Sequence, residues 1–500
     1  MRRYGFVVFL SVLIVYLSFP TKNYYWDGIQ FAQEIETGSG GAWFFHPNHL
    51  LYSPLGRALW IATNDVGWDV RALIVLQSIS IVAGAAAAAV LFCILLETGA
   101  SPYISICLSL AFAFSATWWR FATDAGSYVP STLLVLVCFW LLVRKDPPSP
   151  VAAGLTLCGA MLLHQLAVFF VPSAVLALWV RNKHRPPSTR FVTVALFLLT
   201  AGLPTLGLYV VVFVIQQDVW TVGQFMTWVV SHSQDVSFSF NVPRNLWISL
   251  VGHFRLVLGG NLKLVLAQRS PVSAVAGVAL AVSLLVLFRR LVQIRPQLLR
   301  TFRDEVRWLL PILAVWCGTY ALFLVFWLPH NTFYRLFYFP AMVVFLSMLL
   351  PSVKTKYNRL ALAVGALFLL NFGFHIFPQT KPEANPPLQI ADAMRAIWKP
   401  GDVVYWDVFN ANNRTIRYFN PQVDWKELWG RGYPSQIELS FVENGDVWFD
   451  NAALAEYRRN DSEFEAWLVA NCSVQEVYEF PVGEHVVGFA KIEELPGRKN

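Results

Sequence analysis

Long apolar stretches separated by short polar segments alternate along the first three quarters of the chain. A membrane-spanning helix needs about 20 apolar residues, and somewhat fewer in a thin or funnel-shaped bundle. The stretches that meet this requirement are residues 4–21, 72–96, 102–118, 128–143, 151–164, 166–180, 191–214, 271–288, 308–328, 336–351 and 359–377. The pattern therefore predicts an α-helical polytopic membrane protein with about eleven transmembrane helices.

Residues 151–180 form one uninterrupted apolar run that allows two interpretations. A single helix of this length would span about 45 Å, whereas two halves would each span about 22 Å, less than an ordinary bilayer core. A single helix would also place the basic segment 181–190 on the opposite side from the other basic loops. The charges favour a hairpin that turns at His164 and Gln165.

Basic residues assign the loops to the two sides of the membrane. The N-terminal "MRR" and the loops 144–148, 181–190, 289–307 and 354–359 carry Lys and Arg, which mark the cytoplasmic side. The chain is 56% hydrophobic and only 14% charged, a composition that excludes a soluble globular protein. Its formal charge of +7 reflects the basic cytoplasmic loops, and no basic arm or nucleic-acid-binding motif accompanies it. We expect an integral protein of the plasma (inner) membrane with a cytoplasmic N-terminus.

Residues 378–500 differ in character from the rest of the chain, because they are polar and contain no span. A helix-like stretch at 388–398 precedes a strand-like 402–407, and a second strand-like stretch at 445–450 precedes another helix. This alternation predicts a small soluble α/β domain on the outer face. Residues 1–377 then form the transmembrane domain.

The first outer loop, residues 22–71, carries unusual polar residues. "NYYWDGIQFAQEIE" at 23–36 can form a helix at the interface, with Asp27 and Glu34 on one face after two turns. "FFHPNHLLYSPLGR" at 44–57 adds His46 and His49. A simple channel or a structural span does not require an acid and two histidines in such a loop.

Four short segments in this order carry a resemblance to a known superfamily. They are "WDGIQFA" with "HPNHLLYSPLG", "FSATWWRFATDAGSYVPSTLL", "LLHQLAVFFVP" and "FWLPHNTFYRLFYFP". The chain resembles the GT-C membrane glycosyltransferases, which include protein O-mannosyltransferases and aminoarabinose transferases, and is most similar to a little-characterised bacterial and archaeal branch. The resemblance implies a long first outer loop with an acidic motif, a soluble C-terminal domain and a polyprenyl-phosphate or polyprenyl-diphosphate sugar donor. Gln30 stands where relatives often have a second acid, with Glu34 one turn further, which argues against metal binding by two acids of this loop. Whether a divalent metal such as Mg or Mn serves as a cofactor stays open.

Sugar transfer from a lipid phosphate needs a base for the acceptor hydroxyl and a cation for the departing phosphate. Asp27 is the first candidate for the base, and a helix-capping carboxylate is its alternative. Asp124, in a short outer loop, is the second candidate, and an ion pair with Arg120 one turn earlier is its alternative. Arg335 is the leading phosphate ligand because a guanidinium suits bidentate phosphate recognition, although it can also be an interfacial side chain.

Several further residues are candidate substrate or phosphate ligands. The histidines can bind phosphate or serve as interfacial and interhelical hydrogen-bond partners, and Arg255 can bind lipid headgroups in general. The full predicted set is His46, His49, His164, Arg255, Asn331 and Arg335.

The sequence leaves competing functions open. A membrane glycosyltransferase is favoured, and a lipid-linked glycan transporter or flippase and a cell-envelope polymer ligase are the alternatives. Transporters place ionisable groups at mid-membrane and show internal repeats, whereas the polar residues here gather at the outer surface. The expected partners are a polyprenyl-phosphate-linked sugar, membrane lipids and an acceptor glycan, lipid or protein; the sugar and the acceptor are not identified.

Overall fold

The structure, a computed structural model, describes most of the chain. The described residues are 2–38, 44–144, 146–217, 220–230, 238–259, separate positions between 275 and 289, 308–350, 358–406, 411–427, 433–443, 445–460, 462–482 and 485–495. The predicted span 271–288 therefore lies mostly outside the described residues.

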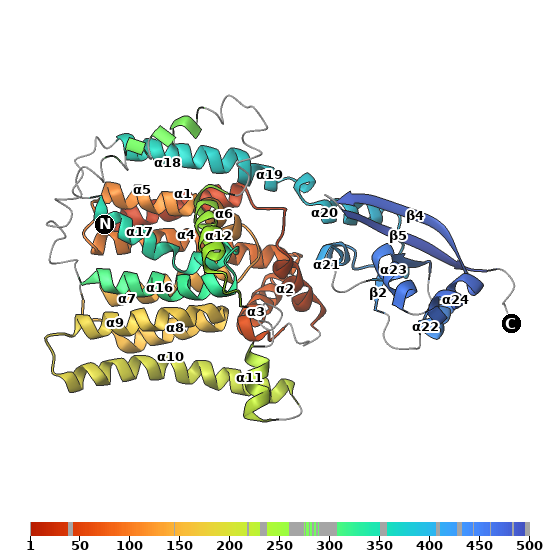
Figure 1. Ribbon diagram of the computed structural model, residues 1–500, viewed down its shortest axis with the longest axis horizontal. Coiled ribbons are helices and arrows are strands. Elements are labelled where there is room, and N and C mark those ends of the chain that lie inside the picture. The colour runs from red at the N-terminus through yellow and green to blue at the C-terminus, as the bar shows by residue number, and fades with distance from the viewer. Residues whose placement is uncertain are drawn as a thin grey trace. The chain divides into compact units, whose positions relative to one another are not determined.

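The chain divides into two compact units (Figure 1). The first comprises Met1–Thr21 and Phe31–Thr380, and the second comprises Lys22–Gln30 and Lys381–Asn500. The sequence predicts a single boundary at 377/378, with all of loop 22–71 in the transmembrane domain. The structure instead groups nine residues of that loop with the C-terminal residues.

The first unit is a helical bundle, and every predicted span among the described residues is largely helical. Figure 1 shows its long helices running side by side, and α4 contacts both α1 and α7 while α8 contacts α7 and α10. The bundle helices are α1 (Arg2–Ser18), α4 (Ala72–Glu97), α5 (Pro102–Ala113), α6 (Ala116–Ala122), α7 (Tyr128–Val143), α8 (Pro150–Leu163), α9 (Val171–Arg181), α10 (Pro187–Gln216), α16 (Leu309–Trp327), α17 (Phe339–Leu349) and α18 (Asn358–Asn371).

Length and hydropathy separate these helices into two groups. Four helical segments among the described residues are long and apolar enough to cross a membrane, namely Ala72–Glu97, Pro187–Gln216, Leu309–Trp327 and Arg359–Gln379. The shorter apolar helices include α1, α7, α8 and α17. The predicted span 102–118 is not straight, because α5 and α6 meet at an angle of 69°. Phe114 and Ser115 leave the helix there, and the Ser115 hydroxyl donates to the Phe112 carbonyl at 2.8 Å.

The predicted hairpin within residues 151–180 is confirmed. His164 has φ −157° and ψ 122°, which ends α8 before the 3₁₀ helix η2 (Gln165–Phe170) and α9. Arg181 at the end of α9 donates to the carbonyl of Arg144, which precedes α8, at 2.8 Å. The two helices therefore return to the same end of the bundle, and His164 lies at the turn.

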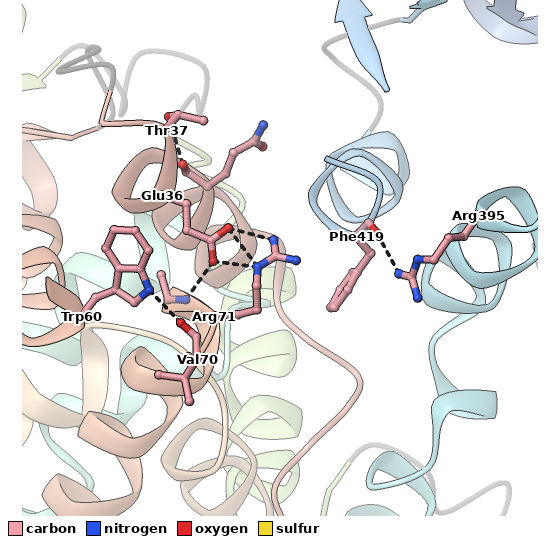
Figure 2. A network of polar contacts seen from close by, with 9 residues as sticks. Glu36, Thr37, Trp60, Val70, Arg71, Arg395 and Phe419 are labelled. Atoms are coloured by element: carbon pink, nitrogen blue, oxygen red, sulfur yellow. Dashed lines mark hydrogen bonds and ion pairs between the residues drawn. The ribbon is translucent and has the colours of Figure 1, made fainter. Parts of the chain in front are cut away.

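Helices of the first loop cap one end of this bundle. They are α2 (Trp26–Thr37), the 3₁₀ helix η1 (Pro47–His49) and α3 (Tyr52–Asp65). Glu36 near the end of α2 accepts from Arg71 Nε at 2.9 Å and from the amide of Ala72 at 2.8 Å, so it caps the start of α4 (Figure 2). Trp60 of α3 donates to the Val70 carbonyl at 2.8 Å.

The second unit contains a five-stranded mixed sheet in the order β2-β1-β3-β5-β4. β1 (Val403–Tyr405) pairs in parallel with β2 (Asp424–Lys426) and β3 (Val447–Asp450), and the long antiparallel hairpin of β4 (Cys472–Val482) and β5 (His485–Glu494) completes it. Apolar residues fill both faces, with α20 (Pro386–Arg395) and α21 (Ala411–Phe419) on one side and α22 (Tyr433–Glu443), α23 (Asn451–Asn460) and α24 (Ser462–Asn471) on the other. The predicted α/β character is confirmed.

Candidate functional site

The loop that carries Asp124 is fixed by buried hydrogen bonds to α4. Gln77 Nε2 donates to the carbonyls of Thr21 and Thr123, at 2.9 and 2.7 Å. Asp124 is fully buried, and its Oδ1 accepts from the amide of Ala125 at 2.8 Å. A buried carboxylate is costly unless it accepts hydrogen bonds, and this backbone hydrogen bond holds the Asp124 side chain in place.

The Asp124 carboxylate interacts electrostatically with the phenol of Tyr52, the first residue of α3. Burial raises the pKa of the Tyr52 phenol far above its usual value, and the Asp124 carboxylate adds to that rise. The alternative ion pair with Arg120 is not among the ion pairs of the described residues; Arg120 Cζ instead lies 5.7 Å from the centroid of the Phe121 ring.

Three histidines predicted as ligands lie together at this end of the bundle. The ring centroids of His46 and His49 are 5.5 Å apart, and those of His49 and His164 are 4.6 Å apart. All three side chains are buried. Rings of Tyr128 and Tyr334 lie 4.9 and 5.9 Å from that of His164. The first loop, the α8–α9 turn and the segment before α17 therefore meet in one aromatic cluster.

A hydrogen bond to Nδ1 of His164 determines which ring nitrogen carries the proton in the neutral form. Its Nδ1 accepts from the amide of Leu166 at 3.1 Å, so a neutral ring carries its proton on Nε2. Nε2 is buried and has no hydrogen-bond partner among the described residues. His49 Nδ1 instead shares a 2.7 Å hydrogen bond with Ser127 Oγ. His164 thus offers a donor for an oxygen-rich ligand.

Arg335 occupies an unusual environment for a cation. Its side chain is completely buried in the 3₁₀ helix η4 (Phe333–Phe337), and burial lowers its pKa. Nη2 donates to the Pro329 carbonyl at 2.7 Å and to Ser249 Oγ at 3.1 Å, while Nε and Nη1 have no partner among the described residues. None of the described ion pairs involves this guanidinium. A buried charge without a counterion is expensive, so the site is suited to an anion.

One face of α12 (Val242–Leu258) forms the wall of this arginine site. Ser249, Gly252 and His253 recur at helical spacing on that face, and a Cβ at Gly252 would lie 2.7 Å from Arg335 Cζ. Glycine is therefore needed here for close approach of the guanidinium.

His253 links the same helix to α17. Its Nδ1 donates to the Ser249 carbonyl at 2.8 Å, and its Nε2 is 2.8 Å from the Tyr338 hydroxyl. Burial lowers the pKa of His253, and the positive charge of Arg335 lowers it further. In the neutral ring Nε2 accepts from Tyr338, which holds α12 against the segment that carries Arg335.

Two other predicted ligands have different surroundings. Asn331 Oδ1 accepts from the amide of Tyr334 at 3.1 Å, so it caps the turn that presents Arg335. The Arg255 side chain is exposed, and its carbonyl accepts from Thr117 Oγ1 and from the Gly259 amide, both at 3.1 Å. The structure therefore places Asn331 beside the arginine site but does not bring the Arg255 guanidinium into it.

Asp27 belongs to the second unit, in the first turn of α2. Its side chain is 7% exposed. Burial lowers the pKa of the Arg414 guanidinium in α21, and the negative charge of Asp27 partly offsets that shift. Within the described residues no group of three or more His, Cys, Asp or Glu side chains is arranged to hold a metal ion.

Comparison with solved structures identifies the architecture. The chain superimposes on ArnT from Cupriavidus metallidurans bound to undecaprenyl phosphate with a TM-score of 0.60 and 10% identity, covering 97% of both chains. The apo structure of the same protein gives a TM-score of 0.60 and 11% identity over 98% of both chains. The chain has the GT-C fold. No protein-family model and no curated protein matches the sequence.

The GT-C fold confirms the predicted class, an α-helical polytopic membrane protein with a small C-terminal α/β domain. Residues that the sequence did not single out complete the arginine site of the first unit, namely Ser249, Gly252 and Tyr338. Within the second unit, Arg414 was likewise not singled out. The spacing of Ser249, Gly252 and His253 places all three on one face of an amphipathic helix. Nothing in the local sequence around Arg414 indicates its place beside Asp27.

Proposed function

We propose that the protein transfers a sugar from a polyprenyl-phosphate or polyprenyl-diphosphate carrier to an acceptor at the outer face of the inner membrane. The observation that carries this proposal is Arg335, a completely buried guanidinium without an acidic partner among the described residues. Hydrogen bonds between a guanidinium and a phosphate are charge-assisted and strong, and Nε and Nη1 of Arg335 have no hydrogen-bond partner among the described residues. The structural neighbour ArnT was solved with undecaprenyl phosphate bound, which supports a polyprenyl phosphate as the anion.

The reaction would proceed at the anomeric carbon of the donor sugar. The acceptor hydroxyl oxygen forms a bond to that carbon while the bond from the carbon to the phosphate oxygen breaks. Asp27 takes the hydroxyl proton as the general base, and the polyprenyl phosphate leaves with the bonding electrons. Arg335 stabilises the charge on the departing phosphate, and His164 donates from Nε2 to a phosphate or sugar oxygen.

Arg335 variants test the proposal with the purified full-length protein in detergent. Undecaprenyl phosphate binding and release of undecaprenyl phosphate from a panel of undecaprenyl-phosphate sugars are measured together. Arg335→Ala should weaken binding by about 10- to 100-fold, because a hydrogen bond to a charged group contributes about 1.5–3 kcal/mol. Arg335→Lys should recover only part of this loss, since an ammonium keeps the charge but cannot place its donors as the planar guanidinium does.

The panel also separates the transferase from its alternatives. A flippase would move the lipid-linked sugar across a vesicle membrane without cleaving the bond between sugar and phosphate. Unchanged binding by Arg335→Ala, or lipid movement without cleavage for every donor, would refute the proposal.

A further inference from the structure

The segment that leads into α2 is built into the C-terminal domain. Within the second unit, Asn385 Nδ2 donates to the Lys22 carbonyl at 2.8 Å, while Asn385 Oδ1 caps α20 through the amide of Leu388 at 3.3 Å. The Tyr24 ring stacks on that of Phe419 with centroids 6.0 Å apart. These contacts fix the chain immediately before Asp27.

Helix α21 supplies the third contact through Arg414. Its Cζ lies 5.1 Å from the centroid of the Trp26 ring, and Trp26 is the residue that precedes Asp27 in the first turn of α2. The Arg414 side chain is half-buried. Burial lowers the pKa of its guanidinium, and the nearby Asp27 carboxylate opposes that shift. Arg414 therefore contacts Trp26 in the first turn of α2 and interacts electrostatically with the Asp27 carboxylate.

The helix that carries Arg414 is itself held firmly. Asn413 Nδ2 donates at 2.7 Å to Oδ2 of Asp450, the last residue of β3. Arg395 of α20 donates to the Phe419 carbonyl at 2.7 Å, which satisfies the C-terminal end of α21 (Figure 2). A side chain on such a supported helix can fix a neighbouring group with little loss of freedom.

We propose that Arg414 is a positioning residue for Asp27, and that the C-terminal domain serves to orient the general base. This inference rests on the proposed function. The guanidinium over Trp26 keeps the first turn of α2 in one arrangement and keeps a positive charge beside the Asp27 carboxylate. Arg414 acts through Asp27 and makes no contribution to phosphate binding, which is assigned to Arg335.

The chain offers a matched control on the same helix. Arg417 lies one turn after Arg414 and also packs over a tryptophan, with its Cζ 5.0 Å from the centroid of the Trp406 ring. Arg417→Met removes a similar charge and a similar cation–π contact, but over Trp406 rather than Trp26. Arg414→Met keeps most of the packing volume and removes the charge.

The experiment measures kcat and donor KM for transfer, together with undecaprenyl phosphate binding. Arg414→Met should lower kcat by about 10- to 100-fold, since small displacements of catalytic groups have effects of this size, while undecaprenyl phosphate affinity stays at the wild-type value. Arg414→Lys should recover much of kcat, and Arg417→Met should match wild type. When Asp27→Asn is already present, Arg414→Met should lower kcat no further, because Arg414 is proposed to affect kcat only through Asp27.

Several outcomes would overturn the proposal. A wild-type kcat in Arg414→Met, an equal loss in Arg417→Met, or additive losses with Asp27→Asn would each do so. If Arg414→Met is not monodisperse, Arg414→Gln replaces it and is judged by the same comparisons. A wild-type protein that transfers no sugar would refute the proposed function, whereas an active wild type with an active Arg414→Met would refute only the role of Arg414.

Discussion

Gly252→Ala probes the arginine site without touching the arginine. The added Cβ would lie 2.7 Å from Arg335 Cζ, 2.9 Å from Nη2 and 3.0 Å from Nη1. Ordinary contacts between such atoms are about 3.5–4.0 Å, so the guanidinium must retreat by about 1 Å. Its hydrogen bonds to Pro329 and Ser249 would stretch, and its remaining donors would no longer point at the same position. Losing one charged hydrogen bond to phosphate should weaken undecaprenyl phosphate binding by about 10- to 100-fold.

Stability should respond in a different way from affinity. Alanine is favoured over glycine inside a helix by about 0.5–1 kcal/mol, which offsets the strain of moving a flexible side chain. We therefore expect a melting temperature in detergent near that of wild type. Gly318→Ala in α16 is the matched control, because a Cβ there meets nothing within 4 Å among the described residues. If Gly252→Ala binds undecaprenyl phosphate as tightly as Gly318→Ala does, Arg335 is not the phosphate ligand.

Further predictions concern the base, the topology and pH. Asp27→Asn should remain folded and bind donor but lose about 10²–10⁴-fold in kcat, because general-base catalysis contributes that much; an active variant would indicate a helix cap. Glu34→Gln should cost much less, since two helical turns, about 10 Å, separate it from Asp27. A reporter fused at residue 390 should be active outside the cytoplasm, and cytoplasmic activity would invert the topology. Because the pKa of His253 is lowered, its neutral form stabilises the fold above pH 6.5 and that stability declines as pH falls below 6.5; thermal melts should show the loss in wild type and less of it in His253→Gln.

The membrane architecture was predictable because apolar length and loop charge act locally. The turn at His164 follows from an apolar run too long for one span and from the basic segment after it. The bend between α5 and α6 was not predictable, because Phe114 and Ser115 lie inside a largely apolar stretch and neither is a proline or a glycine. Each of the three histidines could be proposed as a candidate ligand from its polar side chain in an interfacial or apolar segment. That they lie together depends on tertiary packing.

Asp27 shows the same limit. Asp27 was singled out by its place at the start of an interfacial helix, whereas the neighbour that acts on it comes from the far end of the chain. Arg414 lies in "ANNRTIRYF", which has the composition of an ordinary polar helix. A pairing of residues this distant in sequence leaves no local pattern.

The assignment of Lys22–Gln30 to the C-terminal unit has a consequence for biosynthesis. The partners of this segment, Asn385, Arg414 and Phe419, leave the ribosome only after the membrane helices between them, about 20 to 80 s later at about 5–20 residues per second. During that interval Tyr24 and Trp26 have no partners from the domain that later covers them. Assembly of the first turn of α2 is thus among the last events of maturation, and a nascent chain arrested before residue 381 should leave Trp26 open to a water-soluble quencher.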